Sequence, residues 1–179
     1  MKPAVAVRWA AAAGVIVLAV VLGWRVTHQP KSVLKQVSKG KIVPAPNFDL
    51  PRLDATGKLS LASLRGKAVV LNFWQSSCQP CKQEMPRLEA GSKRWAGKDV
   101  EIVGVDLFDA KFAGLAFRKR YGATYPMVLD ELADTQVPYG LIGTPETFFI
   151  DRRGRIVKRV IGPVSTKEIN ANIRTALAT

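Results

Sequence analysis

The sequence predicts one α/β domain built on a central mixed β-sheet with helices on both faces. Residues 68–74 form a continuous apolar run rich in β-branched and aromatic side chains, as expected of a strand buried on both faces, and residues 100–106 are predicted to form a second buried strand. A helical pattern follows each run, and a pair of strands precedes a last helix, an alternation typical of this class. The chain has 179 residues, which is enough for one such domain but hardly for two.

Turn and cap signals divide the chain into elements. Pro86 predicts a kink inside the first long helix. Gly122 is typical of a helix end and Gly154 of a hairpin turn. Ser165, with Glu168 three residues later, forms a capping box for the last helix. The expected elements are strands at 48–50, 58–61 and 68–74, a helix from the cysteines to about 95, a strand at 100–106, a helix at 110–121, a strand at 127–129 followed by a short helix, strands at 147–151 and 156–160, and a helix from 165 to about 177.

The N-terminal segment predicts a membrane anchor. Residues 9–24 form an uncharged run of 16 residues. A transmembrane helix normally needs about 20 residues, and the apolar part of a cleavable signal has roughly 7–15. Trp9 and Trp24 lie at the two ends, where amphipathic rings prefer the membrane interface, and no small-residue cleavage pattern follows in 25–28. We therefore expect residues 1–26 to form an uncleaved N-terminal transmembrane helix; the alternative is a removed signal peptide.

Basic residues are unevenly distributed along the chain. Residues 1–41 hold seven basic and no acidic residues, which is about half of the formal net charge of +13. The segment 27–43 is polar and bounded by prolines, as expected of a tether, so the globular domain is assigned to 44–179. A second basic cluster, 152–159, surrounds the hairpin turn without interleaved aromatic residues. We interpret it as a solvated face and expect no nucleic-acid binding; attraction to anionic lipid or to an acidic partner is the alternative.

The chain has two cysteines, Cys78 and Cys81, separated by Gln79 and Pro80. They fall where a buried strand ends and a helix begins. A thiolate is stabilised by the unpaired amides and the dipole of a helix N-terminus. We expect Cys78 at the exposed edge of that terminus and Cys81 one turn further in, with Pro80 tolerated in the first turn. The spacing and the context predict a redox-active disulfide.

Two other uses of the cysteine pair compete with the redox one. A zinc half-site would need two more ligands, and the single histidine, His28, belongs to the predicted tether. An inert structural disulfide that closes so short a loop would add little stability.

Four segments of the chain match a known sequence pattern: PNFDLP (46–51), SLASLRGKAVVLNFW (60–74), CQPCKQEMP (78–86) and GTPETFFIDRRGRIV (143–157). Together they resemble the TlpA/ResA/CcmG-like family of membrane-anchored, thioredoxin-like thiol–disulfide oxidoreductases. This resemblance implies a thioredoxin-like fold for 44–179, and it implies neither a cofactor nor a metal.

The resemblance also implies roles outside the pair. Pro145 is expected to be cis and to face the cysteines, with Thr144 presenting its backbone to the substrate. Glu84 is expected to help deprotonate Cys81, whose helix face it shares. The G-x-P-E-T pattern around Glu146 is that of the cytochrome-maturation branch. The alternatives are a trans loop proline at Pro145 and solvated surface acids at Glu84 and Glu146. The expected substrate-binding residues are Trp74, Gln79, Pro80, Thr144, Pro145 and Glu146.

Two positions depart from the pattern of ordinary thioredoxins. Asn72 stands where those proteins have a buried aspartate, and Ser77 stands where they have a tryptophan before the first cysteine. Glu84 is then the best remaining candidate for proton transfer. Gln79 and Pro80 between the cysteines resemble the reducing members of the family, because the strongly oxidising members have a histidine there.

These features predict a protein-disulfide reductase. Cys78 would attack a substrate disulfide and Cys81 would resolve the mixed disulfide, after which a transmembrane electron donor of DsbD/CcdA type would reduce the pair. The resemblance implies that the substrate is apocytochrome c or the cysteines of a copper-site (cytochrome oxidase) assembly protein. It also implies a single-pass protein of the inner membrane with its catalytic domain in the periplasm, although the five basic residues of 25–41 outnumber Lys2 and Arg8, which precede the uncharged run.

The alternative from another functional class is a copper-binding assembly factor on a thioredoxin scaffold. Such factors use C-x-x-x-C with a distant histidine, whereas here the spacing is one residue shorter and the predicted domain has no histidine. A peroxidase of related fold would use a lone reactive cysteine, against which the paired motif argues.

Overall fold

The computed structural model describes residues 40–179, together with 17, 19–20 and 36–37. The chain divides into two units, Met1–Lys31 and Ser32–Thr179, and the second contains the folded domain. The expected anchor at 1–26 and most of the tether at 27–43 lie outside the described residues. Within the described part of the chain, no helix has both the length and the apolar character needed to cross a membrane. The anchor therefore stays a prediction.

The domain contains one large and one small sheet. In chain order its elements are β1 (Val43–Pro44), β2 (Asp49–Pro51), β3 (Lys58–Ser60), the 3₁₀ helix η1 (Leu61–Leu64), β4 (Ala68–Trp74), α3 (Gln79–Trp95), β5 (Val100–Leu107), α4 (Lys111–Arg120), β6 (Met127–Asp130), α5 (Gln136–Tyr139), β7 (Glu146–Ile150), β8 (Arg155–Ile161) and α6 (Thr166–Ala178). The large sheet has six strands in the order β1-β8-β7-β4-β5-β6, and β2 pairs with β3 in the small one.

The large sheet is mixed, as predicted. β4, β5 and β6 run parallel to one another, whereas β7 is antiparallel to both β4 and β8, and β1 is antiparallel to β8. The carboxyl end of β4 is therefore at the same edge as that of β5 and beside the start of β7. Because ligands and catalytic groups gather at the carboxyl ends of strands in open α/β sheets, this edge positions the site.

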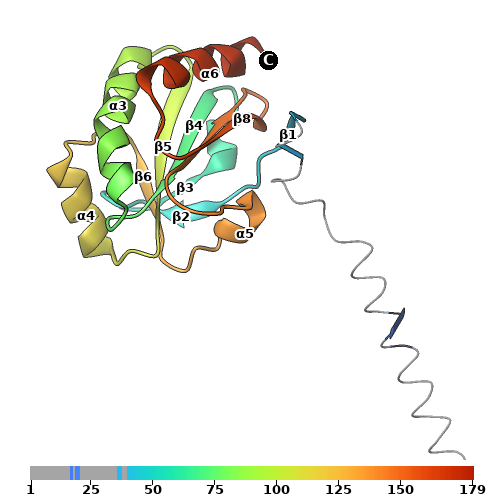
Figure 1. Cartoon of the computed structure of the whole chain (residues 1–179), viewed down its shortest axis with the longest axis horizontal. Helices are drawn as coiled ribbons and strands as arrows, with labels where there is room; N and C mark the ends of the chain where they lie inside the picture. Colours follow the sequence, from blue (N-terminus) through green and yellow to red (C-terminus); the bar gives the residue numbers. More distant parts are fainter. Residues whose placement is uncertain (1–16, 18, 21–35, 38–39) are drawn as a thin grey trace, which may run out of the picture. The chain divides into compact units, whose positions relative to one another are not determined.

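Strand β4 lies at the centre of the sheet and is buried along its whole length. Val70 and Trp74 pack in the cluster formed with α3, α4 and α6, whereas Leu71 and Phe73 pack on the opposite face with η1, α5 and the β2–β3 pair. Figure 1 shows these two layers on either side of the sheet. Because both faces of β4 are buried, its sequence is a continuous apolar run rather than an alternation of apolar and polar residues. The one polar side chain in it, Asn72, belongs to the site.

The cap and turn signals are confirmed, whereas the kink expected at Pro86 stays a prediction. Cys78 is the N-cap of α3, Pro80 lies in its first turn and Pro86 lies inside it. Ser165 and Glu168 form both hydrogen bonds of the capping box of α6. Gly154 has a φ of 73°, which allows the tight turn between β7 and β8.

Strand β1 was not predicted, because the flanking prolines favour a linker. Val43 pairs with Ile156 of β8 and is buried, so the ordered domain includes the last residue assigned to the tether. In the basic cluster at 152–159, three arginines form ion pairs within the domain: Arg152 with Asp99, Arg155 with Asp151 and Arg159 with Glu146. Much of that charge is therefore neutralised locally.

Candidate active site

The cysteines form a disulfide at the carboxyl edge of β4, with Cα atoms 5.3 Å apart. Cys78 is the N-cap of α3, and its Sγ accepts a hydrogen bond of 3.2 Å from the Cys81 amide. The side chain of Cys81 is fully buried, whereas Cys78 is 9% exposed. The expected arrangement, with Cys78 outermost at the helix start and Cys81 one turn inside, is thus present. It favours Cys78 as the thiolate that meets a substrate.

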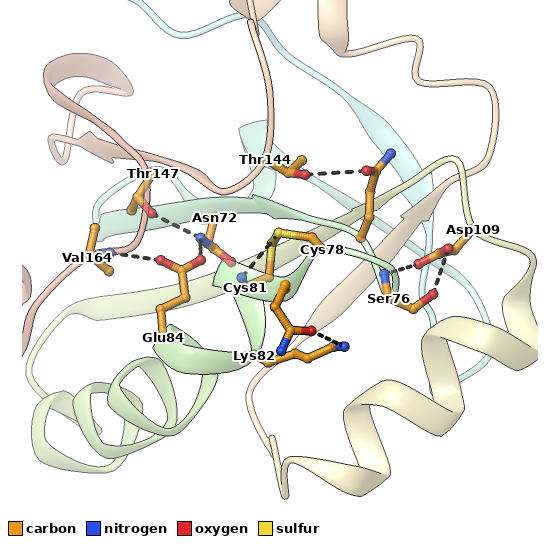
Figure 2. Close-up of a disulfide and its surroundings, with 12 residues drawn as sticks. Asn72, Ser76, Cys78, Cys81, Lys82, Glu84, Asp109, Thr144, Thr147 and Val164 are labelled. Carbon is orange, nitrogen blue, oxygen red and sulfur yellow. Dashed lines mark hydrogen bonds between the residues drawn. A yellow bond between two sulfur atoms is a disulfide. The ribbon is translucent and has the colours of Figure 1, made fainter.

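A cis peptide bond joins Thr144 to Pro145, as expected, and the trans alternative is wrong. Pro145 is buried, and Thr144 is half-buried with its Oγ1 donating to the Gln75 side chain at 3.3 Å. The loop before β7 is thereby joined to the loop after β4, and in Figure 2 Thr144 lies beside the disulfide. That the Thr144 backbone binds the substrate stays a prediction.

Glu84 is fully buried behind the disulfide (Figure 2), so the alternative of a solvated surface acid is wrong. One carboxylate oxygen accepts from the Asn72 amide at 2.8 Å, and the other accepts from the Val164 backbone N–H at 2.9 Å. Burial raises the pKa of Glu84 to about 7, and these hydrogen bonds and the charge of Arg87 oppose a larger rise. Near neutral pH the carboxyl is therefore present in both forms, which suits a group that passes a proton.

Asn72 orients Glu84. Its amide nitrogen donates to Glu84 and also to the Thr147 hydroxyl at 3.0 Å, so both donors are used. An aspartate here would place a second buried carboxylate against Glu84, and an asparagine avoids that repulsion. The departure at position 72 thus leaves one ionisable group behind the cysteines.

Glu146 is also buried, and its carboxylate contacts protein groups rather than solvent. Its carboxylate forms an ion pair with Arg159 and accepts from the backbone N–H groups of Ile142 at 2.7 Å and Gly143 at 3.2 Å. Arg159 also donates to the Gly140 carbonyl at 3.1 Å. The pair holds the loop that leads into the cis proline. The expectation that Glu146 contacts substrate is corrected, because its oxygens are engaged inside the domain.

Trp74 requires the same correction. Its side chain is fully buried and stacks on Phe117 of α4 with ring centroids 4.8 Å apart. It therefore supports the core beneath the site. Gln79 and Pro80 are exposed beside the disulfide, and Gln79 accepts a hydrogen bond from Lys82. Of the predicted substrate-binding residues, these two and Thr144 are at the surface.

A disulfide at the junction of a central strand and a helix, a cis proline beside it and a buried carboxyl behind it define a thioredoxin-like thiol–disulfide oxidoreductase. Residues 43–159 match the AhpC/TSA family model. The chain belongs to the AhpC/TSA family and, within it, to the thiol–disulfide oxidoreductases that resemble ResA.

Individual relatives agree with this assignment. Thiol-disulfide oxidoreductase ResA of Bacillus subtilis is 36% identical over 156 residues, covering 87% of this chain and 85% of the relative. Thioredoxin-like protein YneN of Bacillus subtilis is 32% identical over 171 residues, covering 93% and 96%. The crystal structure of a putative thiol:disulfide interchange protein DsbE from Chlorobium tepidum superposes with a TM-score of 0.71 at 28% identity, covering 75% of this chain and 96% of that one.

Proposed function

We propose that the chain is a disulfide reductase anchored in the inner membrane, with its catalytic domain in the periplasm. The observation that carries the reductase proposal is the set of Cys78 at a helix N-terminus, Cys81 buried behind it and Glu84 one turn further with a pKa of about 7. Cys78 is suited to attack a substrate disulfide, and Cys81 is suited to resolve the mixed disulfide. Glu84 is suited to accept the proton that Cys81 loses in that second step.

The proposed reaction has two exchange steps. The Cys78 thiolate attacks one sulfur of a substrate disulfide, which forms a mixed disulfide and releases the other substrate sulfur as a thiolate. Glu84 then accepts the proton of Cys81, and the Cys81 thiolate attacks Cys78 and releases the second substrate sulfur. The substrate gains two electrons, and the Cys78–Cys81 pair loses two. A transmembrane dithiol donor of DsbD/CcdA type would return two electrons and two protons to the pair.

The reducing direction and the substrate class are supported by the resemblance. Gln79 and Pro80 between the cysteines are similar to the reducing members, and Glu146 belongs to the pattern of the cytochrome-maturation branch. We infer that the substrate is the oxidised haem-attachment pair of an apocytochrome c, or else the cysteine pair of a copper-site assembly protein. Direct copper binding is the competing function, because the same cysteines could hold Cu(I).

The substrate proposal predicts reduction of a disulfide-bonded C-x-x-C-H peptide, the motif of c-type haem attachment. The purified, reduced chain is expected to reduce this peptide with one equivalent of protein per disulfide, as followed by mass spectrometry after alkylation. Cys78→Ser is the inactive control, and Glu131→Gln, which changes an exposed carboxylate, is the matched active one. A reduced chain that leaves the peptide oxidised but binds one Cu(I) tightly would favour the copper-binding alternative.

The proposed location predicts the behaviour of reporter fusions. Alkaline phosphatase fused after Thr179 should be active, because that enzyme needs the disulfides that form in the periplasm. The matching fusion to a reporter that works only in the cytoplasm should be inactive. The opposite pair of results would contradict the location while leaving the chemistry of the cysteine pair untouched. Membrane fractionation of the same cells tests the anchor, since a cleaved chain would be released as a shorter, soluble protein.

A further inference from the structure

The segment that leads into Cys78 is held by a carboxylate from a neighbouring strand end. Asp109 accepts a hydrogen bond of 2.5 Å from the Ser76 backbone N–H and one of 2.9 Å from the Ser76 hydroxyl. Figure 2 shows both bonds beside the disulfide. Hydrogen bonds to an ionised acceptor are about twice as strong as neutral ones. Ser76 precedes the nucleophile by two residues, so this contact fixes the entry to the active-site helix.

An unusual backbone conformation brings Asp109 to this position. Strand β5 ends at Leu107, and Phe108 then adopts a left-handed conformation with a φ of 60°. A residue with a Cβ rarely adopts this conformation without a compensating contact. Here the Phe108 N–H donates to the Asp130 carbonyl at 3.2 Å. The chain is thereby turned so that Asp109 lies across the end of β4.

The region contains a second carboxyl, that of Asp106. Asp106 pairs in register with Trp74 and is fully buried, and among the described residues no hydrogen-bond donor reaches its oxygens. The helix α4 covers it closely, since a Cβ built on Gly114 would lie 1.9 Å from its Oδ2. Burial raises the pKa of Asp106 to about 9, and the Asp109 carboxyl adds to this rise. Burial therefore favours the neutral form of the Asp106 carboxyl.

We propose that Asp109 is a positioning residue that holds Ser76 and keeps Cys78 at the N-terminus of α3 when the disulfide is open. The Cys78 N–H donates to the Gln75 carbonyl at 3.1 Å, so the residues from Gln75 to Cys78 form one turn. In the oxidised chain the disulfide also ties Cys78 to Cys81. Reduction breaks that tie, whereas the two bonds from Ser76 to Asp109 do not depend on it.

The inference rests on the proposed function, in which Cys78 is the nucleophile, and its test isolates that thiol. The full chain carrying Cys81→Ser is the parent, and the readouts are the rate of its reaction with oxidised glutathione and the thiolate absorbance against pH. In this parent, Asp109→Ala is expected to lower the rate by about tenfold through misplacement of Cys78. Asp109→Asn removes the same charge but keeps an acceptor for the Ser76 N–H, so this variant should recover most of the reaction rate. The pKa of Cys78 should also be lower in Asp109→Asn than in Asp109→Ala.

The controls separate positioning from charge and from general stability. Asp49→Ala removes an exposed carboxylate of β2 and should behave as the parent. The positioning role of Asp109 would be wrong if Asp109→Ala reacted with oxidised glutathione as fast as the parent. It would also be wrong if Asp109→Asn lost as much of the reaction rate as Asp109→Ala. Should Asp109→Ala fail to fold, Ser76→Ala takes its place; it removes only the hydroxyl bond and should give a loss of about threefold, and no loss would overturn the inference. A parent whose Cys78 does not react with glutathione would instead overturn the proposed function.

Discussion

Replacement of Cys81 by Ser is expected to leave protein substrates covalently bound to Cys78 and to reduce turnover to background. The first exchange step needs only the Cys78 thiolate, which the N-terminus of α3 stabilises. The second step needs the thiol that the substitution removes. The mixed disulfide should therefore accumulate and run as a higher band on non-reducing gels, which disappears when reductant is added. Mass spectrometry of that band identifies the substrate.

Cys78→Ser is the matched control for this trapping experiment. Cys81 is fully buried, so it should not form a mixed disulfide with a protein. Trapping by the Cys78 variant rather than by the Cys81 variant would reverse the two roles. The absence of any trapped species in either variant would favour an inert structural disulfide.

Replacement of Glu84 by Gln is expected to slow release of the mixed disulfide by about a hundredfold near neutral pH, the scale of a lost general base. In the wild-type chain the release rate should rise as pH increases through about 7, because the Glu84 carboxylate that accepts the Cys81 proton forms in that range. Glutamine accepts no proton there, so this rise should be absent. Single-turnover quenched-flow experiments with alkylation separate the first exchange from the second. An equal slowing of both steps would contradict a role confined to Cys81.

The same group predicts how stability depends on pH. The Glu84 carboxyl has a pKa of about 7 in the folded chain against a reference value of 4.5, so between these values the folded state binds more protons than the unfolded state. The free energy of unfolding should therefore decrease as pH rises from about 4.5 to about 7, by at most about 3 kcal/mol, and level off above. Denaturant unfolding of Glu84→Gln should lack this decrease, whereas Glu131→Gln should retain it.

The fold was predictable where one local signal decides each element. The β4 and β5 runs, the capping box at Ser165 and the turn at Gly154 each carry their own physical reason, and all were found. Strand β1 was missed because its two residues carry no periodic pattern and are stabilised only by pairing with β8. No signal near Val43 reveals that partner.

The site was predictable only in part, for a related reason. The spacing and context of Cys78 and Cys81 indicate their chemistry directly. The buried Glu84 carboxylate accepts a hydrogen bond from the Val164 amide, which is 80 residues away in the sequence. The sequence around Glu84 gives no signal of that contact. Glu146 was wrongly assigned to substrate binding because its partner Arg159 belongs to the next strand. From the sequence, Arg159 was interpreted as part of a solvated basic cluster. The contact between Asp109 and Ser76 likewise depends on the parallel pairing of β4 with β5.

The reduction potential of the Cys78–Cys81 pair tests the central claim most directly. The full chain is equilibrated with glutathione and dithiothreitol buffers, and the oxidised fraction is measured by alkylation. We expect a reversible two-electron transition, about 30 mV for each tenfold change in ratio, with a midpoint more negative than about −200 mV. A midpoint near −120 mV, typical of strong oxidants, would contradict the reducing direction. An oxidised fraction that does not respond to the buffer would contradict thiol–disulfide exchange itself.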